Sequence, residues 1–402
     1  MKSAIVLDGS TKSALAVVRS LGLHGVSVSV GAERGTAMVL HSRHAKRTFV
    51  YPSPYEDVEG FITAIVREAH DCGDEPVMYA MSDATFLALN AHRERIQKCA
   101  TFISPEENVV ELVFNKAATY SFASVTDVPT IPTHIPEREE EVPYLADTLT
   151  YPVVVKPRRS VSWREGRGVF GTATFVHTKK ELCDTFATLK KNTGEAPLVQ
   201  QMVYGEEYGV EALTHQGTIF AMVSHHRIRS LSPTGGASVL KETLDDGDLK
   251  HTLEEYANTL IQKLKWSGPI MIEFKVDSDS LTPFLMEING RFWGSLPLSI
   301  AAGVDVPFLY YTYASSGEVP MEMIRARDGV VTRHFLGDVR HLARTLFSRD
   351  TMRSLLYPRR FKALRDFCSL PKGTQSDVWS WRDPAPALYE VIDVMAKYIH
   401  RT

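Results

Sequence analysis

The sequence lacks several features that would place a protein in a specialised class. It has 4 cysteines among 402 residues, and Cys72, Cys99, Cys183 and Cys368 lie far apart, so neither a zinc motif nor a disulfide framework is indicated. No apolar run approaches the roughly 20 residues that a membrane span requires. The formal net charge is only −3, so charge gives no reason to expect a nucleic-acid partner.

The chain also lacks a pattern typical of secretion. In the N-terminal segment MKSAIVLDGSTKS, Asp8 and Gly9 interrupt the apolar run too soon for a signal peptide. We therefore expect a cytoplasmic protein, in a reducing compartment. The composition, 44% hydrophobic and 23% charged, is that of an ordinary globular chain, and its length suffices for two or three domains.

Strand and helix patterns alternate in the first quarter of the chain. Residues 4–7 and 26–30 have strand character on either side of a helical stretch at 13–21, which predicts a βαβ unit with parallel strands. The same alternation predicts a helix at 58–69, a strand at 77–81 and a helix at 84–92. Gly9 stands alone in the first turn, so the dinucleotide fingerprint G-x-G-x-x-G is absent.

Two loops of this unit follow the carboxyl ends of predicted strands. They are residues 8–11 (DGST) and residues 82–85 (SDAT). Ligands of open α/β sheets bind at such ends, so both loops are candidates for substrate contact. The simpler alternative is that their Ser, Thr and Asp side chains are helix N-caps and nothing more.

The segment FLMEINGRFWGS, residues 284–295, concentrates charged and polar groups. Glu287, Asn289 and Arg291 alternate after an apolar run, so an extended backbone would point all three to one face. Upstream, Glu273 is a lone acid in the strand-like run IMIEFKV, where burial is costly unless compensated. Two acids and an amide form an all-oxygen set that suits Mg²⁺. The alternative is a polar strand face with Arg291 salt-bridged to one acid.

A second lobe is predicted from residue 151 onward, after a helical segment at 106–124 and a Pro-rich, acidic stretch that we expect to be a solvated connector. Lys156 ends the apolar run VVV and precedes a loop with Gly166, Gly168 and Gly171. A lysine and glycine N–H groups suit a phosphate. Glycines at such spacing also mark ordinary hairpins.

Two later segments complete the pattern. LVQQMV, residues 198–203, is strand-like, and a strand linking two lobes can offer backbone groups to an adenine edge, with Glu207 placed to accept ribose hydroxyls. In SHHRIRSLSPTGGAS, Arg227 and Arg229 alternate before a glycine-containing loop at 233–238 that could approach an anion closely. The simpler alternative is an edge strand with solvated arginines and an ordinary turn.

Together these motifs resemble the ATP-grasp enzymes, and among them the group of ATP-dependent carboligases or carboxylate–amine ligases. The resemblance spans roughly residues 1 to 310, and its elements come in family order: Asn115-Lys116, VVVKP, the glycine loop, VQQMVYGEE, Glu273 and MEINGR. The last element is the most specific. In one departure, Gln200 and Gln201 stand where many relatives carry an acid, and an amide can bond an adenine amino group without charge.

The resemblance implies an α/β fold with α+β character in the ATP-grasp lobes. We expect a parallel α/β domain over residues 1–112, a two-lobed ATP-grasp domain over 113–310 with its small lobe at about 150–203, and a mainly helical, arginine-rich region over 311–402. In that last region, helical runs are expected at 338–347 and 351–367, and Asp383 is expected to cap a closing helix. Such basic helices can meet an anionic substrate, a partner or a membrane surface, or simply be solvated.

The resemblance also implies roles for single residues. Lys116 and Lys156 would hold ATP phosphates, Glu207 would accept the ribose, and Glu273, Glu287 and Asn289 would hold two Mg²⁺ ions, with Mn²⁺ as a substitute. Arg291 would act on the transferring phosphate, and Arg229 and Ser238 would contact the substrate or the phosphate. The adenine contacts would be Gln200, Gln201, Met202 and Val203.

The implied reaction passes the γ-phosphoryl group of ATP to a carboxylate, and an amine then displaces phosphate from the acylphosphate. Small carboxylates and amines would be the partners, and a homo-oligomer is compatible with the resemblance. Two alternatives stay open: an ATP-dependent carboxylase that uses carboxyphosphate, and a non-catalytic nucleotide-binding module. No motif identifies the acid or the amine.

Overall fold

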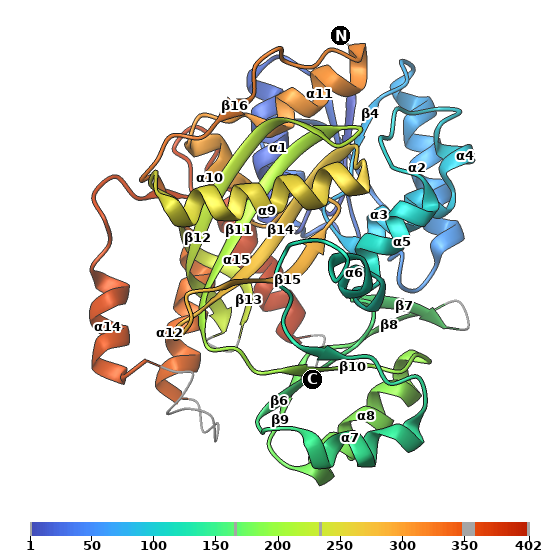
Figure 1. The fold of residues 1–402 in the computed structure, drawn as a ribbon. Coiled ribbons are helices and arrows are strands. Elements are labelled where there is room, and N and C mark those ends of the chain that lie inside the picture. The colour runs from blue at the N-terminus through green and yellow to red at the C-terminus, as the bar shows by residue number, and fades with distance from the viewer. Residues whose placement is uncertain (1, 165–166, 233–234, 348–357, 400–402) are drawn as a thin grey trace.

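The computed structural model describes residues 2–164, 167–232, 235–347 and 358–399. Three β-sheets and one separate hairpin carry the fold, with helices packed around them (Figure 1). This is the mixed α/β architecture expected from the sequence.

The N-terminal domain is a four-stranded parallel sheet with the order β3-β2-β1-β4. The βαβ alternation expected from the sequence is present, because β1 pairs in parallel with both β2 and β4. Strand β1 is buried throughout, as a parallel strand covered on both faces should be. The elements are β1 (Ala4–Val6), α1 (Lys12–Leu23), β2 (Val28–Ala32), η1 (Met38–His41), β3 (Ala45–Val50), α2 (Val58–Cys72), β4 (Val77–Tyr79), α3 (Asp83–Ala91) and α4 (Arg93–Ile96).

The helix expected at residues 106–124 is two helices, α5 (Glu107–Phe114) and α6 (Lys116–Ala123). The break falls at Asn115, whose side chain accepts hydrogen bonds from the backbone N–H groups of Ala117 and Ala118. An asparagine side chain competes with the helix for such groups and therefore caps a new helix. Lys116 consequently occupies the first position of α6.

The small lobe is an antiparallel sheet with the order β5-β10-β6-β9. It has its own apolar core, which includes Val155, Leu182, Phe186 and Val199. The acidic connector expected here to be solvated contributes a strand and a helix to the lobe. The elements are β5 (Thr133–His134), η2 (Glu139–Glu141), α7 (Val142–Thr148), β6 (Val153–Lys156), β7 (Val161–Arg164), β8 (Arg167–Phe170), β9 (Thr174–Val176), α8 (Lys179–Thr193) and β10 (Leu198–Gln201), of which β7 and β8 form the separate hairpin.

The large sheet has the order β15-β14-β11-β12-β13-β17-β18, with β16 paired to β12. Helix α9 lies across the sheet (Figure 1) and buries Leu253, Ala257, Leu260 and Leu264, which recur at helical spacing. The elements are β11 (Gly205–His215), β12 (Thr218–Ser232), β13 (Gly235–Thr243), α9 (Asp248–Leu264), β14 (Gly268–Asp277), β15 (Pro283–Asn289), α10 (Leu296–Ala301), α11 (Val306–Ser316), β16 (Ile324–Arg325), β17 (Val331–Arg333) and β18 (Gln375–Ser376).

The C-terminal region contains α12 (Phe335–Phe347), α14 (Arg360–Cys368) and α15 (Ala385–Ile399). It also contributes β16, β17 and β18 to the large sheet, so it is integrated with the preceding domain. The helix expected at 351–367 lies partly outside the described residues. The Asp383 carboxylate, expected to cap the last helix, accepts hydrogen bonds from Arg19, Ser42 and the backbone of Arg43, and so ties this region to the N-terminal domain.

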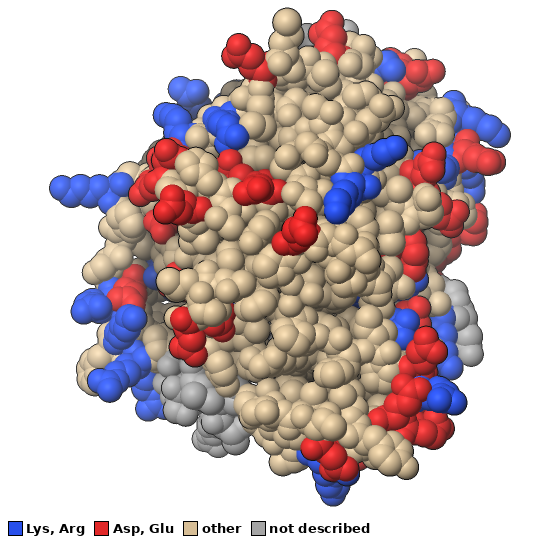
Figure 2. Space-filling view, in the orientation of Figure 1, with Lys and Arg blue, Asp and Glu red and all other residues tan. Residues whose placement is uncertain are grey.

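The surface carries both signs of charge. Figure 2 shows acidic and basic side chains dispersed over one face, with lysines and arginines gathered at its left edge over α14. There Arg359, Arg360, Lys362 and Arg365 are exposed. Among the described helices, none combines the length and apolar character needed to cross a bilayer.

One buried carboxylate, Glu211 of β11, holds the start of α10 against the large sheet. It accepts hydrogen bonds from the hydroxyls of Ser295 and Ser299. His225 Nδ1 lies 3.3 Å from Glu211, without the geometry of a hydrogen bond. Burial raises the pKa of Glu211 to about 7 and lowers that of His225 well below its usual value.

We predict that the stability contributed by Glu211 falls as the pH rises. Its pKa is higher in the folded than in the unfolded state, so the folded state holds an additional proton that it loses as the pH passes through about 7. Between pH 5 and pH 8, the free energy of unfolding should decrease by roughly 2 kcal/mol more in the wild type than in Glu211→Gln. Urea unfolding at both pH values measures this, with Glu206→Gln at an exposed site as the control. Parallel pH profiles of wild type and Glu211→Gln would contradict the prediction.

Candidate functional site

A cavity of about 670 Å³ lies where the N-terminal domain, the small lobe and the large sheet meet. Most residues that the sequence singled out line it. They are Lys156, Gln200, Gln201, Met202, Val203, Glu207, Ser238, Glu273, Glu287, Asn289 and Arg291. Lys116 and Arg229 are not among its lining residues, and their positions are described below.

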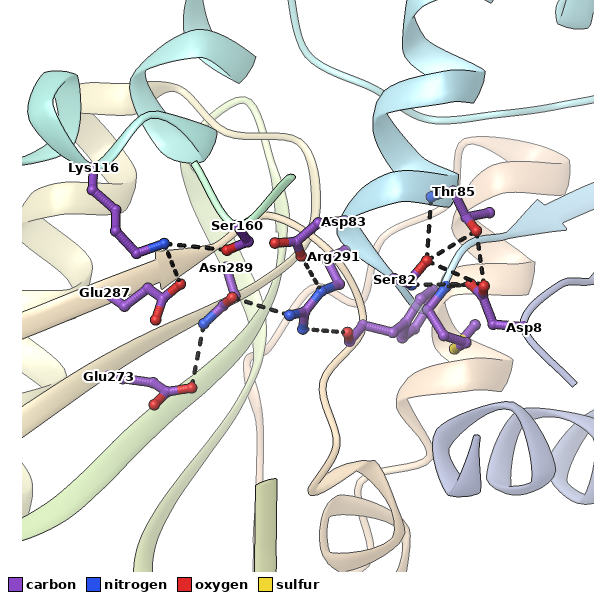
Figure 3. A network of polar contacts seen from close by, with 12 residues as sticks. Asp8, Ser82, Asp83, Thr85, Lys116, Ser160, Glu273, Glu287, Asn289 and Arg291 are labelled. Carbon is purple, nitrogen blue, oxygen red and sulfur yellow. Dashed lines mark hydrogen bonds and ion pairs between the residues drawn. The ribbon is translucent and has the colours of Figure 1, made fainter. Parts of the chain in front are cut away.

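Strand pairing brings the acidic side chains together. Glu273 of β14 and Glu287 of β15 are direct partners in an antiparallel pair, which places their Cβ atoms about 5 Å apart. The Asn289 side chain makes two hydrogen bonds here. Its Nδ2 donates to Glu273 Oε1 at 3.3 Å, and its Oδ1 accepts from Arg291 at 3.1 Å (Figure 3). The side chains expected on one face therefore do meet, although β15 ends at Asn289.

Two cations balance these acids. Lys116 Nζ lies 3.1 Å from Glu287 Oε1 and also donates to Ser160 (Figure 3). Arg227 bridges two carboxylates, donating at 2.8 Å to Glu207 and at 2.8 Å to Glu273. Lys116 thus borders the site through Glu287.

Arg227 was recognised in the sequence, but the functional role was expected of Arg229. The contact of Arg227 with Glu207 could have been inferred from strand register, because the two residues are direct partners in the pair of β11 and β12. These strands join at the turn Gln216–Gly217. A regular hairpin with that turn would pair Glu207 with the residue before Arg227, and a bulge at Leu213 shifts the register by one residue.

Arg229 lies in a different place from the one expected. It donates through two nitrogens to the carboxylate of Asp338 on α12, both at 2.8 Å, and to the carbonyl of Asp366 at 3.2 Å. It lines a neighbouring cavity of about 590 Å³. The pair of Arg229 and the buried Asp338 thus anchors the C-terminal helices on the large sheet. Because the two residues are more than a hundred positions apart, sequence spacing could not show this pairing.

The pKa values follow from burial and from these partners. Burial, with Glu287 and Glu207 close by, raises the pKa of Glu273 despite the opposing effect of Arg227. For Glu207 the balance is reversed: Arg227 and Lys275 outweigh the cost of burial and keep its pKa low. Burial lowers the pKa of Lys156 to about 8.

The donor set fits a hard divalent cation. The carboxylates of Glu273 and Glu287 repel one another, and an ion between them would relieve that repulsion. Within the described ranges no group of three or more His, Cys, Asp or Glu side chains already has the spacing of a metal site. Glu273, Glu287 and Asn289 would therefore supply only part of a coordination shell, as is usual for Mg²⁺ that also binds phosphate oxygens and water.

Arg291 connects the site to the N-terminal domain. Its Nε donates at 2.7 Å to Asp83, the first residue of α3 (Figure 3). The acid that pairs with Arg291 is therefore Asp83, and not a carboxylate of its own strand face. Asp83 lies in the loop 82–85, which was expected to contact substrate, but no role was predicted for this residue itself.

The two candidate substrate loops of the N-terminal domain are tied to each other. The Asp8 carboxylate accepts hydrogen bonds from Met81, Ser82 and Thr85 (Figure 3). Thr11 and Ser82 cap α1 and α3, and Ser10, Thr11 and Asp83 also line the cavity.

At the other end of the cavity, strand β10 leads to the hinge. The Gln200 side chain donates at 2.8 Å to Thr133 Oγ1 of β5, so its amide nitrogen is engaged within the lobe. Met202 and Val203 line both cavities. Ser238 is buried at the opposite side, and residues 233–234 of its loop lie outside the described residues.

The glycine-containing loop forms the hairpin β7–β8, which docks on the N-terminal domain. The N–H of Gly168, expected to face a phosphate, donates to the carbonyl of Tyr55 at 2.5 Å. Trp163 Nε1 donates to Pro54 at 3.0 Å, and the Phe170 ring lies 4.3 Å from the Tyr55 ring. Gly166 lies outside the described residues. A Cβ at Gly168 would come within 2.7 Å of Tyr55, so glycine permits this close approach.

We expect Gly168→Val to undock the hairpin. The added side chain cannot fit against Tyr55, so amide hydrogen exchange should accelerate in peptides covering residues 53–56 and 161–170 while the large sheet keeps its protection. Gly35→Ala is the matched control, because a Cβ at Gly35 meets no atom within 4 Å. Unchanged exchange in the valine variant would rule out docking through Gly168.

Comparison with known proteins agrees with this geometry. Residues 194–335 match the profile of the family described as ATP-grasp in the biosynthetic pathway with Ter operon. The carbamoyl phosphate synthase arginine-specific large chain of Halalkalibacterium halodurans is 20% identical over 215 residues, which are 53% of this chain and 20% of that protein. The chain therefore spans about a fifth of that relative's length.

Two solved structures have a similar fold. The biotin carboxylase domain of Hydrogenobacter thermophilus 2-oxoglutarate carboxylase, a dimer crystallised with MgADP, ADP and bicarbonate, superposes with a TM-score of 0.64 at 17% identity, over 82% of this chain and 74% of that one. The L-amino acid ligase of Bacillus licheniformis gives a TM-score of 0.59 at 18% identity, over 80% and 75%.

The three-part architecture, the family match over the central strands and the likeness to these structures agree with one another. Residues 194–335 thus match an ATP-grasp family, and the chain shares its fold with these solved structures.

Proposed function

We propose that the protein is an ATP-dependent carboxylate–amine ligase, which forms an amide or peptide bond through an acylphosphate and releases ADP and phosphate. One observation carries the proposal. A single cavity gathers the oxygen donors Glu273, Glu287 and Asn289 with the cations Lys156 and Arg291. This is the set of groups that phosphoryl transfer requires, because positioning and neutralisation of charge account for most of its catalysis.

Glu273, Glu287 and Asn289 would hold Mg²⁺, with Mn²⁺ as a substitute. Bound Mg²⁺ neutralises charge on the phosphoryl oxygens. Lys116, next to Glu287, and Lys156 would add positive charge beside the same oxygens. Since the Lys156 side chain has no ion pair or hydrogen bond in the described part of the chain, its ammonium is available to a phosphate.

Arg291 would bind the phosphoryl group during its transfer. Its bonds to Asp83 and Asn289 fix the guanidinium at the junction of the large sheet and the N-terminal domain. That junction is also where Ser10 and Thr11 line the cavity. The arrangement supports a direction of transfer from the nucleotide toward the N-terminal domain, where the acid would bind.

The nucleotide would lie along the hinge between the small lobe and the large sheet. Residues 200–203 would contact the adenine, and Glu207 would accept ribose hydroxyls. The docked hairpin β7–β8 would help to exclude water, which otherwise hydrolyses an acylphosphate. The dimeric state of the Hydrogenobacter domain supports a homo-oligomer for this chain, which sedimentation velocity can measure.

A carboxylase is the second candidate. The bicarbonate in the Hydrogenobacter structure favours a reaction in which bicarbonate accepts the phosphoryl group to give carboxyphosphate. The L-amino acid ligase favours the ligase. Both reactions use the same nucleotide and metal groups, so they differ only in the acid that is activated.

The distinguishing experiment is mass spectrometry of products and measurement of ADP after incubation with ATP, Mg²⁺ and pooled amino and sugar acids, with and without bicarbonate. A ligase yields a product with the mass of acid plus amine less one water, and its ADP release requires both substrates. ADP release that requires bicarbonate identifies the carboxylase. No ADP above background across the screen would overturn both and favour a nucleotide-binding module.

Replacement of Glu287 by glutamine tests the metal assignment. The variant keeps the size of the side chain but loses the charge that would bind Mg²⁺, so turnover should fall by at least roughly 100-fold. ADP formation at saturating ATP measures the loss, and circular dichroism verifies the fold. Glu206→Gln, at an exposed position of β11, is the matched control. Turnover close to wild type in Glu287→Gln would refute the assignment.

The affinity for ATP should depend on pH through Lys156. Its pKa is lowered to about 8 by burial, so the ammonium is mostly charged below that pH and mostly neutral above it. The dissociation constant for MgATP should therefore rise as the pH increases from 7 to 9. In Lys156→Arg, whose guanidinium stays charged, this rise should be absent. Equal pH profiles for both proteins would exclude Lys156 from phosphate binding.

A further inference from the structure

The cavity continues beyond the groups assigned to ATP and Mg²⁺. Its far end is lined by Ser10 and Lys12 at the start of α1, by Ser238 on β13, and by Arg340 on α12 of the C-terminal region. Ser238 and the loop that contains Ser10 were singled out from the sequence, whereas Lys12 and Arg340 were not. They come from three segments that are distant along the chain.

Arg340 differs from most cations of the cavity. Lys12, Arg227, Lys275 and Arg291 are each in an ion pair with a carboxylate. Within the described residues, Arg340 and Lys156 are the lysine or arginine side chains of the cavity wall that have no ion pair or hydrogen bond. Lys156 is already assigned to ATP.

Arg340 is also partly buried. The carboxylate of Glu390 lines the same cavity, but His334 Nε2 lies 2.5 Å from it. Removing a guanidinium from water is costly without a partner, so an anionic ligand would stabilise this side chain.

Lys12 provides a second, more deeply buried donor. Its side chain is 9% exposed, and its ammonium donates at 2.7 Å to the carbonyl of Ser238 and at 2.9 Å to Asp377. An ammonium has three N–H donors, so one remains for a ligand in the cavity that Lys12 lines.

The surroundings of Lys12 carry more positive than negative charge. Asp377 accepts through the same oxygen from Lys241 as well, so one carboxylate serves two ammonium groups. Burial lowers the pKa of Lys241 to about 7, with Lys12 adding to the effect. An anion near Lys12 would relieve this imbalance.

Neutral donors complete the group. The hydroxyls of Ser10 and Ser238 make no hydrogen bond within the described part of the chain, so both can donate to a ligand. Ser10 immediately precedes Thr11, the N-cap of α1, and the N-terminal end of a helix adds a partial positive charge.

We propose that Arg340, Lys12 and the hydroxyls of Ser10 and Ser238 form an anion subsite that binds a carboxylate or phosphate group of the acid substrate, separate from the phosphates of ATP. The identification of the ligand as the acid substrate rests on the proposed ligase function. The subsite itself rests only on the unpaired guanidinium, the remaining ammonium donor and their common cavity. It gives the C-terminal region a direct part in substrate recognition.

Calorimetric titration with succinate and with inorganic phosphate tests the subsite, in the presence of saturating Mg²⁺ and a non-hydrolysable ATP analogue that occupies the nucleotide site. We expect wild type to bind at least one of these anions, and Arg340→Gln to weaken that binding at least 10-fold. Succinate and phosphate distinguish a carboxylate-binding subsite from a phosphate-binding one. Affinity for the ATP analogue should change less than 2-fold.

Arg344→Gln is the matched control, because it removes the same charge one turn further along α12, from a side chain that donates to the carbonyl of Leu231 at 3.3 Å. It should bind the anions as wild type does. Failure of wild type to bind either anion, or equal binding by wild type and Arg340→Gln, would overturn the subsite.

Turnover separates this inference from the proposed function. Once an acid is known, Arg340→Gln should raise its KM at least 10-fold and leave the KM for ATP unchanged. Loss of anion binding in Arg340→Gln without ADP formation from any acid would leave the subsite in place and remove the ligase function. A normal KM for the acid in Arg340→Gln would remove the subsite and leave the ligase function in place.

Discussion

The pairing of Glu273 with Glu287 across β14 and β15 is the constraint on which the rest of the site depends. An antiparallel register places two carboxylates side by side on a largely buried sheet, where their repulsion is weakly screened. Three neighbouring side chains compensate this negative charge: Arg227 bridges Glu273 to Glu207, Lys116 pairs with Glu287, and Asn289 donates to Glu273. A site with such a concentration of oxygen donors and cations suits Mg²⁺ and a polyphosphate, because both can exchange with the existing ion pairs.

Ion pairs between distant segments also hold the domains around the cavity. Arg291 joins the large sheet to the N-terminal domain through Asp83, and Lys12 joins α1 to the C-terminal region through Asp377. Arg229 binds Asp338 and so anchors α12 on the sheet. The C-terminal region is thus part of the wall of the site. The small lobe has a separate apolar core, which would let it adjust around a nucleotide without disturbing the sheet that carries the acids.

The cations in and around these two cavities differ in whether they have a protein partner. Arg229 has a partner, because its guanidinium donates two hydrogen bonds to the buried carboxylate of Asp338 and so anchors α12. By contrast, the side chains of Lys156 and Arg340 are each partly removed from water and have no ion pair or hydrogen bond with another described residue. Lys156 lies on the small lobe and Arg340 on α12, and both line the cavity.

Much of the fold and the strand that carries Glu287 and Asn289 could be predicted from the sequence by itself, because period-2 and period-3.6 patterns are local. The βαβ start, the strands that end in Lys156 and Asn289, and the spacing of Glu287, Asn289 and Arg291 all follow from neighbouring residues. The break at Asn115, the strand β5 and the strands of the C-terminal region did not, since short elements depend on tertiary partners. The sequence likewise could not show that Arg227 bridges two acids, that Asp83 holds Arg291, that Asp338 holds Arg229, or that Arg340 and Lys12 share a cavity. Those pairings join residues dozens to hundreds of positions apart, and only the packing of the domains decides which charges meet.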